Sequence, residues 1–101
     1  MKTGTINLSE LRVIQGVVPL KGVTSVQLLS ENLSGSTTFN LQFSNDKISW
    51  ANAKESGADV TGTLISGAVI FEAFSGIPGS YYQIIFAGAT TGNISYVKNP
   101  L

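Results

Sequence analysis

Hydrophobic residues in this chain alternate with polar ones at a spacing of two, and this period constrains the fold more than any other feature. In residues 37–44, Phe39, Leu41 and Phe43 share one side, while Thr, Asn, Gln and Ser occupy the other. Successive side chains of a β-strand point to opposite faces, so the spacing predicts a strand with one buried face. The turn-forming cluster at 45–47 follows at once, which predicts a hairpin.

The same period, interrupted by Gly, Pro, Asn and Asp, indicates further strands. They are expected at residues 11–18, 24–30, 48–50, 63–65, 68–74, 80–87 and 93–98. The polar stretch 51–61 is expected to be a loop with its sharpest break at Ser56-Gly57. No segment has the 3.6-residue period of an amphipathic helix. About eight short strands without helices predict an all-β fold, namely a small antiparallel β-sandwich of jelly-roll-like form.

A chain of 101 residues has room for one domain. We expect residues 21–101 to form a single β-sandwich domain. Residues 1–20 are expected to precede this domain and to supply its first strand, with Pro19 near the strand end.

Three of the expected strands carry hydrophobic residues on both faces. In residues 81–87 one face is apolar, yet Tyr81 and Ile85 share the other face with Gln83. Single surface hydrophobics are normal, but a repeated two-sided pattern favours coverage by another polypeptide. Because each such burial stabilises by about 2 kcal/mol, a few per subunit are enough to hold an assembly such as a trimer together, and we expect a homo-oligomer. The expected contact residues are Ile14, Val18, Ile70, Phe74, Tyr81 and Ile85.

The chain contains no histidine and no cysteine. Ser-His-Asp and Cys-His catalytic arrangements and zinc sites built on imidazole or thiolate are therefore excluded. Glu55 and Asp59 lie in a polar stretch where charged residues are common. Asn45 and Asp46 fit turn capping better than calcium binding, because the alternating ligand spacing of calcium loops is missing. We expect no enzymatic activity, no cofactor and no metal site.

The charge pattern also restricts the partners. Six basic and six acidic residues give zero net charge and are scattered singly, so no basic stripe is available for nucleic acid. The longest apolar stretches are too short to span a bilayer, and the first residues lack the apolar core of a signal peptide. We expect neither a nucleic-acid nor a membrane partner, and synthesis in a cytoplasm.

Aromatic residues leave a carbohydrate-binding module open as an alternative function, because exposed aromatic rings stack on sugars. The candidates are Trp50, Tyr81, Tyr82 and Tyr96. For Trp50, packing in the core is favoured over sugar binding, because it lies just beyond a strongly alternating strand.

Two stretches resemble hairpins of β-sandwich proteins from phage virions. Residues 39–50, Phe-Asn-Leu-Gln-Phe-Ser-Asn-Asp-Lys-Ile-Ser-Trp, are similar to a hairpin with an alternating strand, an Asp-containing turn and a following aromatic residue. Residues 81–94 are similar to the closing hairpin of the same proteins. Lys47 departs from the pattern, since the turn usually carries Gly there. Discoidin-like sugar-binding domains have a related hairpin, but their usual length is greater, which favours the phage family.

The resemblance implies a capsid decoration or cement protein, which is typically β-rich, often trimeric and attached to the capsid lattice. It therefore favours a trimer. The N-terminal segments of such proteins often serve as arms that reach a neighbouring subunit, so the resemblance also implies an N-terminal arm in residues 1–20. The implied partners are other copies of the chain and the major capsid protein or another virion protein. The implied location is the virion, after synthesis in the host cytoplasm. A tail or neck component, or a glycan-binding module for host attachment, remains the alternative.

Overall fold

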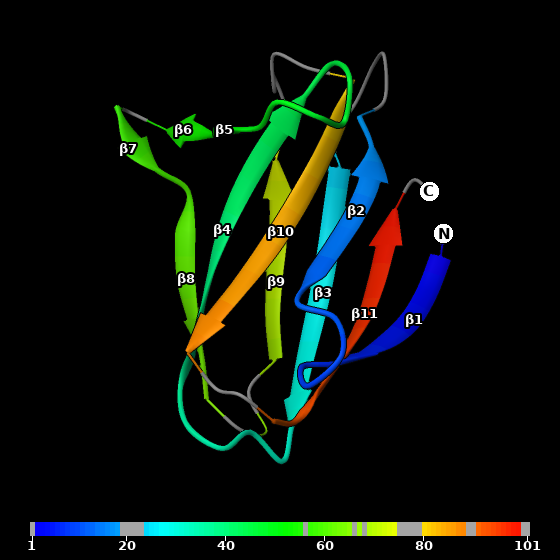
Figure 1. The fold of residues 1–101 in the computed structure, drawn as a ribbon, viewed down its shortest axis with the longest axis vertical. Coiled ribbons are helices and arrows are strands. Elements are labelled where there is room, and N and C mark those ends of the chain that lie inside the picture. Colours follow the sequence, from blue (N-terminus) through cyan, green and yellow to red (C-terminus); the bar gives the residue numbers. More distant parts are fainter. Residues whose placement is uncertain are drawn as a thin grey trace.

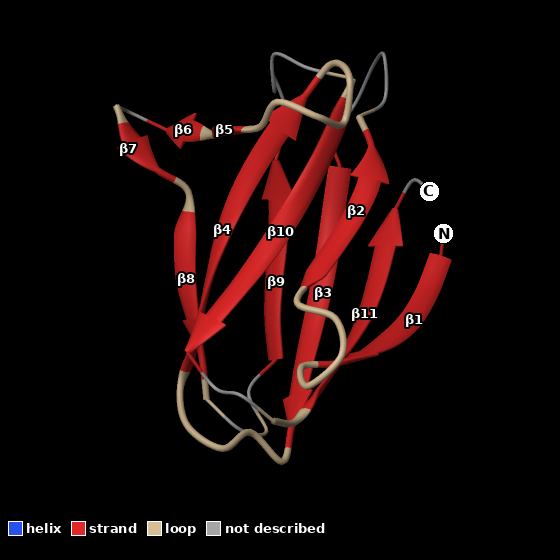
Figure 2. Cartoon of the chain, in the orientation of Figure 1, coloured by secondary structure: helices blue, strands red, loops and turns tan. Residues whose placement is uncertain are grey.

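The computed structural model describes residues 2–18, 24–55, 57–65, 67, 69–74, 80–88 and 91–99, without the side chains at 24, 55, 69–74 and 99. Across these residues the chain forms β-strands and no helix (Figure 2). The strands are β1 (Lys2–Asn7), β2 (Val13–Val17), β3 (Thr24–Glu31), β4 (Thr37–Ser44), β5 (Ala51–Asn52), β6 (Lys54–Glu55), β7 (Ala58–Asp59), β8 (Thr61–Leu64), β9 (Val69–Phe74), β10 (Tyr81–Gly88) and β11 (Asn93–Asn99). The predicted all-β class is therefore confirmed.

The long strands form two antiparallel sheets (Figure 1). A four-stranded sheet has the order β1-β11-β3-β9. A five-stranded sheet has the order β2-β10-β4-β5, and β8 pairs with the remaining length of β4. Consecutive long strands alternate between the sheets, except that β4 and β8 share one. This order is that of a jelly roll, in which two sheets close over one core.

The core lies between the sheets and takes large side chains from both. The fully buried members include Tyr82, Phe86, Ile84, Leu64, Leu28, Ile94 and Val26. Phe39 and Phe86 meet with their ring centroids 6.4 Å apart and their planes tilted by 59°, a favourable aromatic arrangement. The predicted inward faces of residues 37–44 and 81–87 are correct, because Phe39, Leu41, Tyr82, Ile84 and Phe86 are all buried.

Glycines make room for the aromatic rings of the sandwich. The pairs that face each other across the strand pairing are Gly4 and Tyr96, Gly16 and Tyr82, and Gly62 and Phe39. A Cβ atom at Gly16 would lie 2.4 Å from the Tyr82 ring, well inside contact distance. Each ring therefore covers the backbone of its glycine partner, and the absence of a side chain there is a packing requirement.

Lys98 connects the two sheets near their β1 and β2 edges. It lies on β11, is only 8% exposed, and its ammonium donates to the backbone oxygen of Gln15 on β2. Burial, followed by the charge of Lys2, lowers the pKa of Lys98. The contact joins β11 to the strand that lies opposite it.

The described part of the N-terminal segment, residues 2–18, contributes a strand to each sheet. Within residues 1–20, β1 pairs with β11 and β2 pairs with β10, both inside the same chain. The two strands supply Ile6 and Ile14 to the core. Residues 2–7 and 13–17 therefore form edge strands of the two sheets.

The region after β4 also differs. The return strand predicted at 48–50 is wrong, because those residues follow a tight turn and pairing with β4 begins only at Ala51. The stretch predicted as a loop, 51–61, contains β5 and a small hairpin of β6 and β7. Gly57, at the predicted break, has a φ of 82°, which suits a hairpin turn.

Candidate functional site: the outer face of the five-stranded sheet

The outer face of the five-stranded sheet is set by its central strand, β10. Tyr82, Ile84 and Phe86 face the core, so the period of two directs Tyr81, Gln83 and Ile85 outward. Cross-strand register places residues of β2 and β4 beside them. The outward side chains therefore form rows that run across the sheet, perpendicular to its strands.

The middle row is a chain of hydrogen-bonded amides, which we call the amide ladder: Gln15, Gln83, Gln42 and Asn52. Gln83 is the register partner of both Gln15 and Gln42, and Gln42 is the partner of Asn52. Gln15 Nε2 donates to Gln83 Oε1 over 3.1 Å, and Gln83 Nε2 donates to Gln42 Oε1 over 2.7 Å. Gln42 Nε2 then donates to Asn52 Oδ1 over 2.9 Å. The ladder thus crosses all four strands from β2 to β5.

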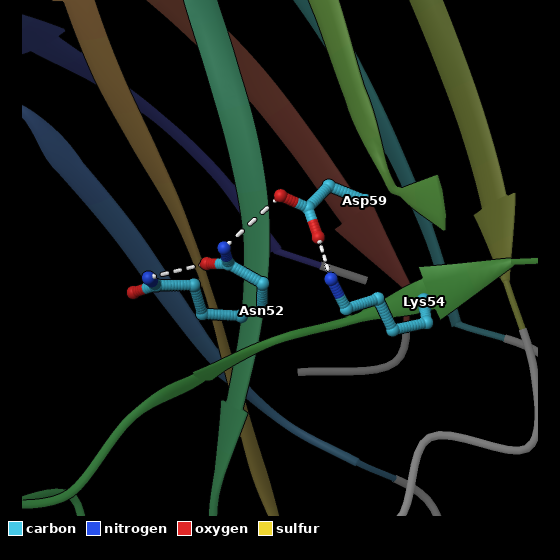
Figure 3. Close-up of polar contacts among 4 residues, drawn as sticks. Asn52, Lys54 and Asp59 are labelled. Carbon is cyan, nitrogen blue, oxygen red and sulfur yellow. Dashed lines mark hydrogen bonds and ion pairs between the residues drawn. The ribbon is translucent and has the colours of Figure 1, made fainter. Parts of the chain in front are cut away.

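The ladder ends on an ion pair in the β6–β7 hairpin (Figure 3). Asn52 Nδ2 donates to Asp59 Oδ2 over 3.2 Å, and the Lys54 ammonium pairs with the other oxygen of Asp59. The hydrogen bond from Lys54 has the largest effect on the pKa of Asp59 and lowers it. Desolvation, the next largest effect, opposes this, but the charge of Lys54 and the bond from Asn52 add to the lowering, so the pKa lies below its usual value. Asp59 is therefore ionised at neutral pH.

The ionised carboxylate sets the direction of the whole ladder. Because it can only accept hydrogen bonds, Asn52 must turn its NH2 group toward Asp59 and its oxygen toward Gln42. Gln42 must then donate to Asn52 and accept from Gln83, and the same reasoning orients Gln83 toward Gln15. Aligned hydrogen bonds polarise one another, which strengthens the chain as a unit.

Apolar rows lie on either side of the ladder. One row pairs Val17 with Tyr81, and the other pairs Val13 with Ile85. Val17 is 52% exposed, whereas Val13, Tyr81 and Ile85 are half-buried. The outer face therefore alternates apolar, amide and apolar rows across β2 and β10.

The β4–β5 turn adds to the row of Val17 and Tyr81. The Lys47 ammonium lies 4.7 Å from the centroid of the Tyr81 ring, within the range of a cation–π contact. Lys47 has a φ of 63°, the left-handed conformation that favours glycine, which agrees with its place in the turn pattern. The next residue, Ile48, is 82% exposed. We call Val17, Lys47, Ile48 and Tyr81 the end patch.

Asp46 holds this turn in shape. Its Oδ1 accepts from the backbone nitrogens of Ile48 and Ser49 over 2.8 and 2.9 Å and from the Ser44 hydroxyl. These bonds, led by the one from Ser49, lower the pKa of Asp46. Asn45 accepts from the backbone nitrogen of Ser80. Both side chains weighed as calcium ligands therefore have structural partners, and the described residues contain no cluster of acidic groups suited to a metal.

A hollow of about 140 Å³ adjoins the ladder between β4 and β10. It is lined by Thr38, Phe39, Asn40, Gln42, Ile85 and Ala87. Gln42 belongs to both the hollow and the ladder, so one amide joins the two features. A larger hollow of about 350 Å³ lies on the outer face of the four-stranded sheet, where Thr3, Thr5, Gln27 and Ser95 are among its lining residues.

The predicted contact residues divide into three groups. The prediction that Ile14 is a contact residue is wrong, because its side chain is 2% exposed and belongs to the core. Val18 is partly buried and packs against that core. The two-sided pattern of β2 hid which face points inward, and Val13 and Val17 occupy the outer face instead. Tyr81 and Ile85 do lie on the outer face, half-buried.

Ile70 and Phe74 belong to β9, whose backbone pairs with β3. Their side chains lie outside the described part of the structure.

The aromatic candidates are also separated by the fold. Tyr82 is fully buried in the core, and Tyr96 packs against the core over Gly4. The prediction of a core position for Trp50 is wrong, because this side chain is half-buried and does not belong to the buried core. Of the tyrosines considered for sugar stacking, Tyr81 is the one on the outer face of the five-stranded sheet.

Sequence reasoning missed the amide ladder. Gln15, Gln42 and Gln83 sit at polar positions of predicted strands, where Gln is an ordinary solvent-facing residue, and Asn52 lies in the stretch predicted as a loop. What makes the four a unit is the register among β2, β10, β4 and β5, of which only β4 and β5 are close in sequence. The available signal was weak: Gln15, Gln42 and Gln83 each occupy the middle of a predicted strand.

No described helix is long and apolar enough to span a membrane. Comparisons of this chain with protein families, with curated proteins and with solved structures found no match.

Proposed function

We propose that this chain is a non-enzymatic structural protein of a phage virion, of the capsid decoration type. It assembles as a homo-oligomer, with a trimer favoured, and attaches to the major capsid protein or to another virion protein in the tail or neck. Support comes from the jelly-roll strand order, an architecture used by viral capsid domains. The resemblance of residues 39–50 and 81–94 to phage virion hairpins points the same way.

The end patch is the observation that carries the attachment mechanism. Ile48 at 82% exposure and Val17 at 52% lie at the same end of the sheet as Tyr81, which is the register partner of Val17. Two of the four large exposed hydrophobics of the described residues thus lie at this end of the sheet, and exposed apolar surface of this kind is typical of contact surfaces. Burial of Ile48 against a partner contributes about 1.5 to 3 kcal/mol, and burial of Val17, which is already half covered, contributes less.

The structural roles of Asp46 and Asp59 favour a binding role over a catalytic one for this face. Asp59 is paired with Lys54, and Asp46 caps its own turn. Both have lowered pKa values, so neither is a proton donor at neutral pH. Attachment therefore rests on shape and surface burial, with no chemical step.

Charge placed in the end patch tests this function. Purified phage capsids are mixed with the chain, pelleted and analysed for bound protein, and light scattering after size exclusion gives the oligomeric state. Wild type is expected to pellet with capsids and to run as an oligomer. Ile48→Asp and Val17→Asp should lose binding while keeping the wild-type circular dichroism, since both side chains are exposed.

Thr3→Asp, an exposed site on the outer face of the four-stranded sheet, is the matched control and should bind as wild type does. A monomeric wild-type chain that stays in the supernatant of every capsid preparation would contradict the proposal.

A further inference from the structure

We infer that the outer face of the five-stranded sheet binds a neutral glycan, with the amide ladder as its hydrogen-bonding surface. This inference goes beyond the virion assignment and does not depend on it. It starts from Gln83, which is 6% exposed although it points away from the core. An amide so enclosed on an outer sheet face is justified by its two hydrogen bonds, which hold Gln15 and Gln42 in place.

The ladder leaves unused hydrogen-bonding capacity in fixed positions. A side-chain amide has two N–H groups and two oxygen lone pairs, and the ladder takes one of each from Gln42 and from Asn52. Gln15 is exposed, and Gln42 and Asn52 are half-buried, so these three present their remaining groups to a ligand. Gln83 is a positioning residue, since it is enclosed by its neighbours.

Neighbouring hydroxyls of a sugar ring are a donor and an acceptor side by side, which matches the NH2 and oxygen of an amide. Because the Asp59 carboxylate orients every amide in the row, the ligand does not need to order them on binding. Preorganised groups lose less conformational entropy, so each contact contributes more of its energy to affinity.

The apolar row of Val13 and Ile85 suits the C–H faces of the same rings. Ile85 also lines the hollow of about 140 Å³ that Gln42 borders, together with Thr38 and Asn40. A sugar seated there meets apolar carbon on one side and amides and a hydroxyl on the other. This mixture fits a glycan better than the core of a protein interface, which is depleted in polar groups.

The charges of this face favour a neutral ligand. Lys54 is neutralised by Asp59, and Lys47 lies over the Tyr81 ring at the end patch. Along the ladder itself the described side chains are uncharged amides. A nucleic acid or a sulfated glycan needs several unpaired cations along its length, and these rows do not offer them.

Side-chain NMR signals give a direct test, because the NH2 groups of the ladder are themselves observable. The ¹⁵N-labelled chain is titrated with neutral oligomers of glucose, mannose, galactose and N-acetylglucosamine, and separately with a heparin fragment and a DNA duplex. We expect at least one neutral oligomer to move the NH2 signals of Gln15, Gln42 and Asn52. Gln42→Ala should then weaken binding about tenfold.

Gln27→Ala is the matched control, because Gln27 is an exposed glutamine in the hollow of the other sheet. It should bind as wild type does, and Gln42→Ala should still pellet with capsids if the virion function holds. The inference is overturned if no neutral oligomer moves these signals at concentrations far above a millimolar dissociation constant. It is equally overturned if the shifts map to Gln27, if only the charged probes bind, or if concentrating the protein alone produces the same shifts.

Discussion

The two faces of the five-stranded sheet use the same strands for different physical purposes. On the inner face, Tyr82 covers Gly16 and Phe86 packs against Phe39, so the face is organised by shape. On the outer face, Gln83 is held between Gln15 and Gln42, so the face is organised by the direction of hydrogen bonds. Neighbouring residues of β10 thus belong to two systems, which tolerate substitution in different ways.

The two faces therefore differ in how a substitution affects stability. The inner face has no spare volume, so even one added carbon forces large side chains to move. The outer face borders solvent, so a broken contact is partly replaced by water, and the loss is limited to hydrogen bonding and local order. Stability is expected to depend on the inner face, and binding on the outer one.

The largest effect is expected from Gly16→Ala on the inner face. The new Cβ would lie 2.4 Å from the Tyr82 ring, which is itself fully buried. Overpacking of this kind destabilises by about 3 kcal/mol. Urea unfolding measures it, with Gln15→Ala, the adjacent outward residue, as the control that should lose less than about 1 kcal/mol. Equal losses at the two positions would remove the distinction between the faces.

Alkaline pH probes the inner face a second way. Burial, with a smaller effect from Tyr96, raises the pKa of Tyr82 from 10.0 to about 12. The folded state therefore keeps Tyr82 neutral while the unfolded chain ionises it. This stabilisation is complete below pH 10 and lost as pH rises through 12, a loss of roughly 2.5 kcal/mol.

Unfolding midpoints measured from pH 9 to pH 12 by circular dichroism follow this loss. Tyr82→Phe should remove the loss of stability that is expected between pH 10 and pH 12. Tyr81→Phe, on the outer face of the same strand, should retain that loss. A pH profile unchanged by Tyr82→Phe would show that the phenol is not the group being titrated.

Gln83→Ala on the outer face is expected to have a smaller effect. It removes both bonds of the central amide and leaves the oxygen of Gln42 and the NH2 group of Gln15 without that partner. Because water reaches both neighbours, we expect a loss of about 1 to 2 kcal/mol. Thermal unfolding gives the stability, and NMR should reveal altered NH2 signals as far away as Asn52. Unaltered signals at Asn52 would mean that the ladder is not a connected unit.

The smallest effect is expected in the turn that borders the outer face. Lys47 adopts a left-handed backbone and also contacts the Tyr81 ring. Lys47→Ala keeps the unfavourable backbone and loses the ring contact, whereas Lys47→Gly relieves the backbone. We therefore expect the Gly variant to be more stable than the Ala variant by about 1 kcal/mol, as measured by urea unfolding. The opposite order would exclude backbone strain as the controlling term.

The sequence predicted some parts of this molecule well, and the reason is local. Alternation in residues 37–44 and 81–87 placed Phe39, Leu41, Tyr82, Ile84 and Phe86 inside, because the period of a strand is a property of the backbone. In β2 both faces are apolar, so the period of two does not show which face points to the core, and the prediction places Ile14 on the wrong face. The polar 51–61 stretch hid a hairpin because its strands are only two residues long.

Composition and period by themselves determined that this chain is all-β, lacks histidine and cysteine chemistry, and has one buried face in its clearest strands. Only the tertiary structure decided which side of β2 faces the core, and that Gln15, Gln83, Gln42 and Asn52 form one row. The physical reason is the distance along the chain over which each feature is determined. Side-chain direction along a strand is set by adjacent residues, whereas cross-strand register depends on the packing of segments tens of residues apart.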